Sequence, residues 1–148
     1  QNGIRFKWHL VGEGQLLKEL REKAFESDVN DCFIFEGNQV NPYPYIKNAD
    51  LLACSSDYEG FSSFVAEGLV LGKAVVTTEC TGMKELLGSS QYGIITESNA
   101  KALSEGIKNL LSDNSLKEKY EIDASERGRH FSIEASVKGA EDFFVLLK

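Results

Sequence analysis

The feature that most constrains this fold is an alternation of short, mostly apolar stretches with segments of helical spacing. Stretches expected to form strands occur at 6–11, 32–35, 50–54, 74–78 and 93–96. Nearly continuous apolar strands are typical of parallel sheets covered on both faces, and the intervening helices supply the crossovers that parallel strands need. The pattern predicts an α/β fold with a doubly wound, Rossmann-like parallel sheet that spans residues 1–148 as a single domain.

Helical segments are marked by apolar residues three or four positions apart and by glycine or capping residues at their ends. They are expected at 16–24, 45–48, 61–71, 83–87, 99–112, 115–128 and 132–147. Gly72 ends the segment 61–71, and Asn99 or Ser98 caps the segment 99–112. The C-terminal region, about 131–148, is rich in aromatic residues, and we expect it to dock on another domain. Its apolar residues include Phe131, Val137, Phe143, Phe144 and Leu147.

Composition excludes several classes of protein. The chain has 148 residues with no low-complexity run, which suits one globular domain. Acidic residues exceed basic ones by 23 to 16, and this formal charge of −7 disfavours nucleic-acid binding, which requires clustered Lys and Arg. No apolar stretch approaches the ~20 residues of a membrane span, and the amino end lacks the apolar region of a signal peptide.

The cysteines indicate the redox compartment. Cys32, Cys54 and Cys80 are far apart, form no Cys-x-x-Cys pair and are odd in number. Such residues are typical of small buried thiols in a reducing compartment, so we expect a cytoplasmic location. The amino end resembles an internal boundary of a longer protein.

The segment from Ser56 to Glu67 carries the features of a ligand site. Ligands of doubly wound sheets bind beyond the carboxyl ends of the strands, which here means the loops 12–15, 37–45, 55–61, 78–83 and 96–99. In the segment, Gly60 lets backbone amides approach a ligand, and the following helix offers its positive N-terminus to an anion such as a diphosphate. Glu59 and Glu67 are eight residues apart, so both carboxylates can flank one ligand if Glu59 lies at the helix mouth.

Glu67 has two interpretations from spacing alone. A carboxylate within an otherwise apolar helix is costly to bury without a partner, and vicinal sugar hydroxyls are good donors to it. Alternatively, Glu67 points to solvent or takes part in a capping hydrogen bond. The two interpretations have about even weight on these residues alone.

The motifs together resemble the family 4 glycosyltransferases, which are retaining enzymes of the two-domain GT-B fold. The string Ser-x-x-Glu-Gly-Phe-Ser-x-x-x-x-Glu begins at Ser56 and is followed by a Gly-Lys-Ala-Val-Val-Thr run and a Thr-Gly-Met-Lys-Glu run. The strand Trp-His-Leu-Val before Gly12-Glu13-Gly14 is similar to the family's first strand and turn. The resemblance covers nearly the whole chain and implies the C-terminal, donor-binding domain of such an enzyme.

The resemblance also implies roles for individual residues. Glu59 would face the donor sugar as the catalytic carboxylate, and Glu67 would bind the ribose hydroxyls. The backbone amides of Gly60, Phe61 and Ser62 would meet the diphosphate and sugar. Gly12 and Gly14 would form a turn close to the donor. Tyr43 and Tyr45 lie in the segment that resembles the family's base-binding loop, although tyrosines in such a loop more often pack than stack on a base.

The family's chemistry needs no metal or other cofactor, and this sequence has neither an Asp-x-Asp motif nor a His/Cys cluster with ligand spacing. The expected partners are a nucleotide-sugar donor and an N-terminal acceptor domain that this chain lacks. The resemblance further implies a surface-polysaccharide pathway and peripheral association of the full-length protein with the inner face of a membrane. We expect the chain alone to bind donor weakly and to lack transferase activity.

Three departures from the family pattern stand out. The Arg and Lys that neutralise the diphosphate lie upstream of the first strand in the family and are not in this chain. Thr81-Gly82 replaces a Gly-Gly pair, so residue 81 cannot freely adopt positive φ. Ser55 stands where a proline is common.

Two other functions are compatible with the fold. A nucleotide-sugar epimerase shares the fold and donor class, but the Glu-Gly-Phe context disfavours it. A non-enzymatic doubly wound module, such as a receiver domain, requires a phosphoacceptor Asp at a strand's carboxyl end. Asp50 begins its strand instead.

Overall fold

The structure is a computed structural model that describes residues 4–146. The chain divides into two compact units, the first ending at Tyr45 and the second beginning at Ile46. The short helix α2, Tyr43–Asn48, spans this boundary.

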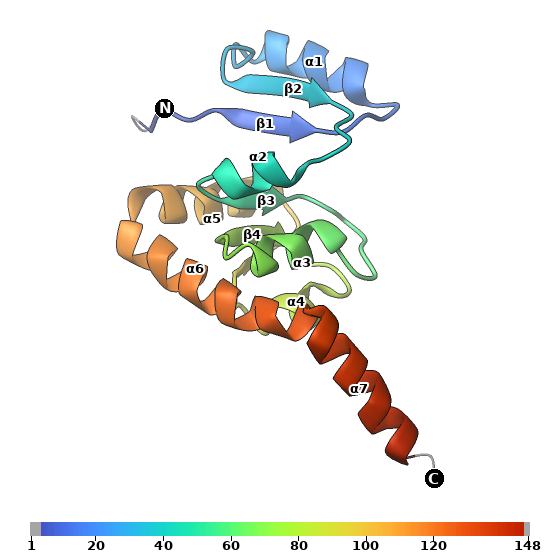
Figure 1. Ribbon diagram of the computed structural model, residues 1–148. Helices are drawn as coiled ribbons and strands as arrows, with labels where there is room; N and C mark the ends of the chain where they lie inside the picture. The colour runs from blue at the N-terminus through green and yellow to red at the C-terminus, as the bar shows by residue number, and fades with distance from the viewer. Residues whose placement is uncertain (1–3, 147–148) are drawn as a thin grey trace. The chain divides into compact units, whose positions relative to one another are not determined.

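Unit 1 is one strand–helix–strand crossover. Strand β1, Trp8–Val11, and strand β2, Phe33–Gly37, pair in parallel with Trp8 opposite Phe33, and helix α1, Leu17–Glu26, connects them (Figure 1). The register shifts between Leu10 and Val11. The guanidinium of Arg21 on α1 lies 4.5 Å from the centre of the Phe35 ring, so the helix covers its strands partly through long polar side chains.

Unit 2 contains a second parallel sheet, in the order β3-β4-β5, with a helix after each strand. The strands are β3, Leu52–Cys54, β4, Val75–Thr78, and β5, Ile94–Thr96. The helices are α3, Ser63–Val70, α4, Met83–Leu87, α5, Ala100–Ser112, and α6, Asn114–Gly128, followed by a 3-10 turn η1, Arg129–Phe131, and α7, Ile133–Leu146.

The core of unit 2 lies on both faces of this sheet. Val75 belongs to the face that packs against α3 and α4, and its neighbour Val76 belongs to the opposite face, against α5. The helices approach closely because of two glycines. A Cβ on Gly68 of α3 would lie 2.5 Å from Leu52, and one on Gly106 of α5 would lie 2.9 Å from Val76. The expected fold class, α/β with parallel strands buried on both faces, is confirmed for this unit.

The helix ends follow the capping residues. The side chains of Asn99 and Asp113 accept hydrogen bonds from backbone amides three residues on, each at 2.9 Å, and start α5 and α6. The helix expected at 61–71 begins instead at Ser63, because Ser62 adopts an extended conformation and caps it. Gly72 has φ of +65° and ends that helix as predicted.

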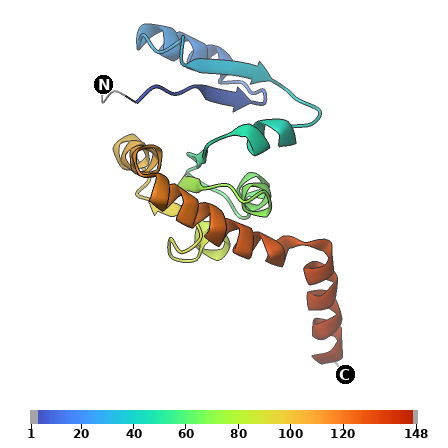
Figure 2. The same cartoon turned by 60° about the vertical axis from the view of Figure 1, so that its left-hand side comes forward.

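The C-terminal region differs from the expectation in one respect. Phe131 lies in η1 and packs against the core of unit 2, so this residue serves its own domain. Docking of the C-terminal region on another domain stays a prediction. Helix α7 then leads away from the sheet of unit 2 in both views (Figures 1 and 2). Val137 on this helix is exposed. The side chains of Phe143 and Phe144, and Leu147 as a whole, lie outside the described residues.

Candidate functional site

The carboxyl ends of the three strands of unit 2 meet at one edge of the sheet. Cys54 is opposite Thr77, and Thr78 is opposite Thr96, so the loops after β3, β4 and β5 begin side by side. This edge is where doubly wound sheets bind ligands, and the segment Ser56–Glu67 begins there.

Side chains from the two neighbouring strand ends hold the turn between β3 and α3. The hydroxyl of Thr78 donates to the carbonyl of Ser56 at 2.7 Å, and the hydroxyl of Ser98 donates to the Asp57 carboxylate at 2.9 Å. Neither Thr78 nor Ser98 was predicted as a site residue. The available signal was a hydroxyl residue at, or just after, the carboxyl end of a strand that borders the ligand edge.

Backbone packing fixes the same turn from a second side. Gly82, just before α4, has φ of +89°, and a Cβ placed there would collide with the carbonyl oxygen of Gly60. The positive φ of this turn therefore falls on Gly82. Among the described residues, the non-glycine positions with positive φ are Asp28 and Ser90, so Thr81 is not one of them. Thr81 is not strained, so the departure from the family's Gly-Gly pair leaves this turn intact.

The N-terminus of α3 faces the turn. The Ser62 hydroxyl accepts from the Val65 amide at 3.5 Å, and the Ser62 carbonyl accepts from the Ala66 amide at 3.0 Å. The amides of Ser63 and Phe64 belong to the first helical turn, where no carbonyl of the helix can reach them. This arrangement has the character of an anion site, with free amides and the positive end of the helix dipole in one place.

The two candidate carboxylates occupy different elements. Glu59 lies in the turn before the Ser62 cap rather than at the mouth of the helix, and its side chain is half-buried. Glu67 lies inside α3 and is also half-buried, among neighbours that are buried. Both side chains therefore remain partly accessible, as groups that bind a ligand must be.

Cys80 lies next to Glu59. Burial raises the pKa of the Cys80 thiol, and the nearby Cys54 and Glu59 raise it further. A thiol with a raised pKa stays protonated near neutral pH, so Cys80 adds no negative charge to the ligand edge.

The lysines near the motif are engaged with protein groups. Lys73 donates to the backbone carbonyl of Ala49 at 3.0 Å, and Lys84 forms an ion pair with Glu79 at 2.5 Å. The Glu85 side chain is exposed, and the backbone carbonyl of Glu85 accepts a hydrogen bond from Arg127 at 2.5 Å. These contacts favour the structural interpretation of Lys73, Lys84 and Glu85.

The candidate residues of unit 1 form their own arrangement. Gly12 has φ of +126° and donates its amide to the Gly37 carbonyl at 2.7 Å, so a glycine is needed at this turn. Gly14 accepts from the Leu17 amide at 3.1 Å and has open space around its Cα. The turn connects β1 to α1, as the sequence predicted.

One of the two candidate tyrosines, Tyr45, contacts a carboxylate of unit 1. The Tyr45 hydroxyl donates to Glu36 Oε2 at 3.3 Å, and His9 Nδ1 lies 2.7 Å from Glu36 Oε1. Burial, followed by the charge of Glu36, raises the pKa of Tyr45. Tyr43 is half-exposed, and its amide donates to Asn41 Oδ1 at 3.1 Å. Tyr45 is therefore held within unit 1, whereas the Tyr43 ring reaches solvent.

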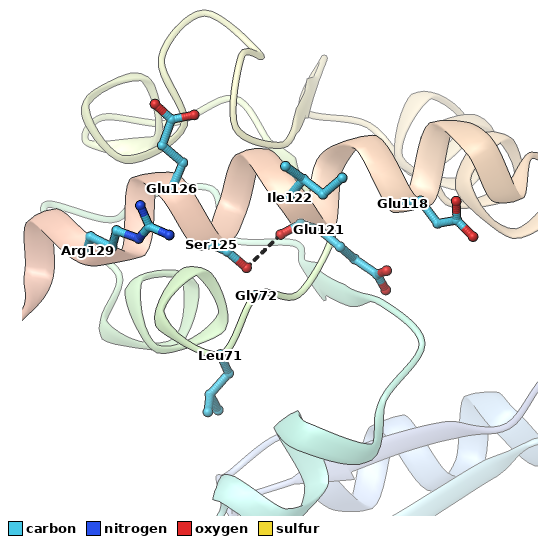
Figure 3. Close-up of a pocket in the computed structure, with 8 residues that line it drawn as sticks. All are labelled: Leu71, Gly72, Glu118, Glu121, Ile122, Ser125, Glu126 and Arg129. Carbon is cyan, nitrogen blue, oxygen red and sulfur yellow. Dashed lines mark hydrogen bonds between the residues drawn. The ribbon is translucent and has the colours of Figure 1, made fainter.

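A separate hollow lies at the other end of α3, between Leu71 and helix α6 (Figure 3). It has a volume of about 630 Å³, and one wall carries the carboxylates Glu118, Glu121 and Glu126. The Ser125 hydroxyl donates within this wall to the Glu121 carbonyl at 2.9 Å. The lining carries three carboxylates against one cation, Arg129, and this net negative charge repels a diphosphate. The hollow is therefore a poor candidate for a nucleotide site.

The described residues contain no group of three or more His, Cys, Asp or Glu side chains placed to hold a metal ion. Within the same residues, no helix is long and apolar enough to cross a membrane.

Comparison with known proteins decides the family. The model described as glycosyl transferases group 1 matches residues 1–128. The chain belongs to this family. A Campylobacter jejuni enzyme, N-acetylgalactosamine-N,N'-diacetylbacillosaminyl-diphospho-undecaprenol 4-alpha-N-acetylgalactosaminyltransferase, is 33% identical over 135 residues, 90% of this chain and 36% of that protein. The amylovoran biosynthesis glycosyltransferase AmsK of Erwinia amylovora is 30% identical over 112 residues, 70% of this chain and 28% of that protein.

The fold of this group 1 glycosyl transferase chain also matches solved structures. Anabaena HepE, crystallised in complex with UDP, superimposes with a TM-score of 0.85 at 21% identity, over 95% of this chain and 41% of that one. The chain spans about a third of the length of the two curated relatives named above. The resemblance stated from the sequence and the expected class of transferase are confirmed at the level of the family.

Proposed function

We propose that this chain is the donor-binding part of a retaining, family 4 glycosyltransferase that takes its sugar from a nucleoside diphosphate. The observation that carries the proposal is the turn between β3 and α3. Thr78 and Gly82 hold its backbone, and Ser98 holds its Asp57 side chain. The turn leads into a capped helix whose first amides are available to an anion.

Three groups in this segment are assigned to the donor. The amides of Gly60, Phe61 and Ser62, with the N-terminus of α3, bind the diphosphate and stabilise the charge that develops as the sugar leaves. Glu67 accepts hydrogen bonds from the ribose hydroxyls, since its carboxylate is half-buried on the same helix. Glu59 faces the sugar hydroxyls as the catalytic carboxylate.

The unit 1 assignments are also part of the proposal. Gly12 and Gly14 approach the donor through their backbone, and the accessible Tyr43 ring is the better candidate for contact with a base than Tyr45. Chemical-shift changes at these residues on addition of nucleotide test the assignment for unit 1 by itself.

The full-length protein would transfer the sugar to an acceptor of a surface-polysaccharide pathway. The support is that the named relatives act on a diphospho-undecaprenol-linked sugar and in amylovoran biosynthesis. We further propose that the protein works in the cytoplasm, at the inner membrane face, and that transfer needs no metal. Undiminished nucleotide binding in the presence of EDTA is the expected result.

A titration tests the donor role. Calorimetry with UDP, GDP, ADP and their sugars should show binding of at least one nucleotide to the chain. The Glu67→Ala variant should lose about tenfold in affinity, because one charge-assisted hydrogen-bond pair is worth about 1.4 kcal/mol or more.

Glu121→Ala is the matched control, since it removes the same charge from a half-buried helical position in the separate hollow. It should bind as the wild-type chain does. Binding of no nucleotide, or equal affinity of the Glu67 and Glu121 variants, would refute the donor role.

A further inference from the structure

The ring of Phe61 in the donor-binding turn contacts a residue far along the chain. Phe61 is 54% exposed, so the core does not fix its position. Its ring meets that of Phe131 in η1 edge to face, with centroids 6.2 Å apart and planes at 70°. Phe131 is half-buried and packs against the main core of unit 2. The exposed Phe61 ring therefore packs against the Phe131 ring, which is itself fixed by the core.

Arg127 holds Phe131 in place. Its guanidinium lies 5.3 Å from the centre of the Phe131 ring and 5.4 Å from that of Tyr92. Its Nε donates to the Leu86 carbonyl at 3.0 Å, and a terminal nitrogen donates to the Glu85 carbonyl at 2.5 Å. These carbonyls end α4, where a cation with a fixed fork of donors is well suited.

Helix α6 itself is fixed against α3 at Gly128, between Arg127 and Phe131. A Cβ on Gly128 would collide with the carbonyl oxygen of Leu69, so the two helix backbones are in contact there. Helix α4 thus connects to the turn twice. At its start Gly82 packs on the Gly60 carbonyl, and at its end Arg127 supports the ring that meets Phe61.

We propose that Phe131 and Arg127 are positioning residues that hold the donor-binding turn through Phe61. The proposal rests on the donor role assigned to that turn. A Phe side chain has two rotatable torsions, so a ring held at its edge restricts the Cα and amide that carry it. The amide of Phe61 is one of the groups assigned to the diphosphate, and small displacements of such groups are costly.

The test measures affinity for whichever of UDP, GDP and ADP the wild-type chain binds best. Phe131→Leu should weaken binding about fivefold to tenfold, because the leucine fills much of the volume but offers no ring edge to Phe61. Phe131→Tyr, which keeps the ring, should bind within about twofold of wild type. Tyr120→Leu is the control for loss of a half-buried aromatic, because Tyr120 packs against the opposite face of the sheet.

A double-mutant cycle separates positioning from general destabilisation. If Phe131 acts through Phe61, then Phe131→Leu in a Phe61→Leu background should change affinity by less than about twofold. Losses that simply multiply would overturn the proposal, as would wild-type affinity in Phe131→Leu.

Arg127→Lys supplies the test if Phe131→Leu does not fold. Lysine keeps the charge but cannot hold both carbonyls and a ring, so affinity should fall about threefold or more, whereas Arg129→Lys, at an exposed neighbour, should have no effect. Equal affinity of the two variants would refute the role of Arg127. A wild-type chain that binds no nucleotide would refute the proposed function, and this inference with it.

Discussion

The glycine-containing turns of the two units are held in different ways. In unit 1, the turn at Gly12 and Gly14 is fixed by backbone hydrogen bonds to Gly37 and Leu17, and a Cβ on either glycine would meet nothing within 4 Å. In unit 2, side chains from neighbouring strand ends and the backbone at Gly82 fix the turn after β3. The first turn can tolerate change, whereas the second is constrained from several directions.

The two units also differ in how much of their cores is buried. Of the described residues up to Tyr45, Ala24 is the one buried side chain, and both strands of unit 1 are at most half-buried. Unit 2 buries apolar residues on both faces of its sheet. The candidate residues with the most restricted backbone are therefore those on the unit with the core, as a preorganised anion site requires.

The largest expected effect comes from separating the units. A fragment of residues 46–148 should unfold cooperatively on heating, because both faces of its sheet are covered. A fragment of residues 1–45 should show no cooperative transition, since two strands and one helix with a single buried residue are not stable alone. Circular dichroism melts of both fragments and the whole chain test this. A cooperative melt of the first fragment would contradict the comparison.

Gly82→Ala should destabilise unit 2 by about 3 kcal/mol, since positive φ strain adds to a collision with the Gly60 carbonyl. Gly60→Ala is the matched control, because a Cβ there meets nothing within 4 Å and the backbone φ is ordinary. Urea unfolding of both variants measures the difference. Equal urea midpoints for the two variants would contradict the prediction, because the turn would then accommodate a Cβ at residue 82 without loss of stability.

Much of the fold could be predicted because its signals are local. The alternation of apolar strands and helices predicts every strand to within two residues, and Asn99 was one of the two residues expected to cap α5. Two helix starts were wrong by two residues: the helix expected at 45–48 begins at Tyr43, and the one expected at 61–71 begins at Ser63. Phe61 has an apolar side chain that suits a helix, but the extended backbone of Ser62 excludes it.

The parts that could not be predicted depend on contacts between distant residues. Nothing in the spacing of the sequence connects Phe61 with Phe131, or Asp57 with Ser98, because only the folded sheet and helices bring them together. The contact of Thr78 also joins distant residues, since its hydroxyl donates to the Ser56 carbonyl in the loop after the neighbouring strand. The sequence therefore identifies the candidate ligand groups better than it identifies the residues that hold them.

Gly12→Ala tests the other side of the comparison. The φ of +126° strains any other residue, but the space is open, so the loss should be about 1–2 kcal/mol, smaller than for Gly82. Gly14→Ala, with ordinary φ and open space, should be neutral or slightly stabilising. Thermal melts of the two variants check this. A loss at Gly12 as large as at Gly82 would mean that the first turn is not the more tolerant one.

Ser62→Ala has the smallest expected effect on stability. The Ser62 hydroxyl lies 3.5 Å from the Val65 amide, whereas the Asn99 cap of α5 is at 2.9 Å. We therefore expect a loss of about 0.5 kcal/mol for Ser62→Ala and about 1 kcal/mol for Asn99→Ala. Nucleotide affinity should change less than twofold in Ser62→Ala, because the proposed contact is made by the backbone amide, which the substitution retains. A tenfold loss of affinity would instead assign the hydroxyl itself to the ligand, so that this turn would bind through a side chain as well as through its backbone.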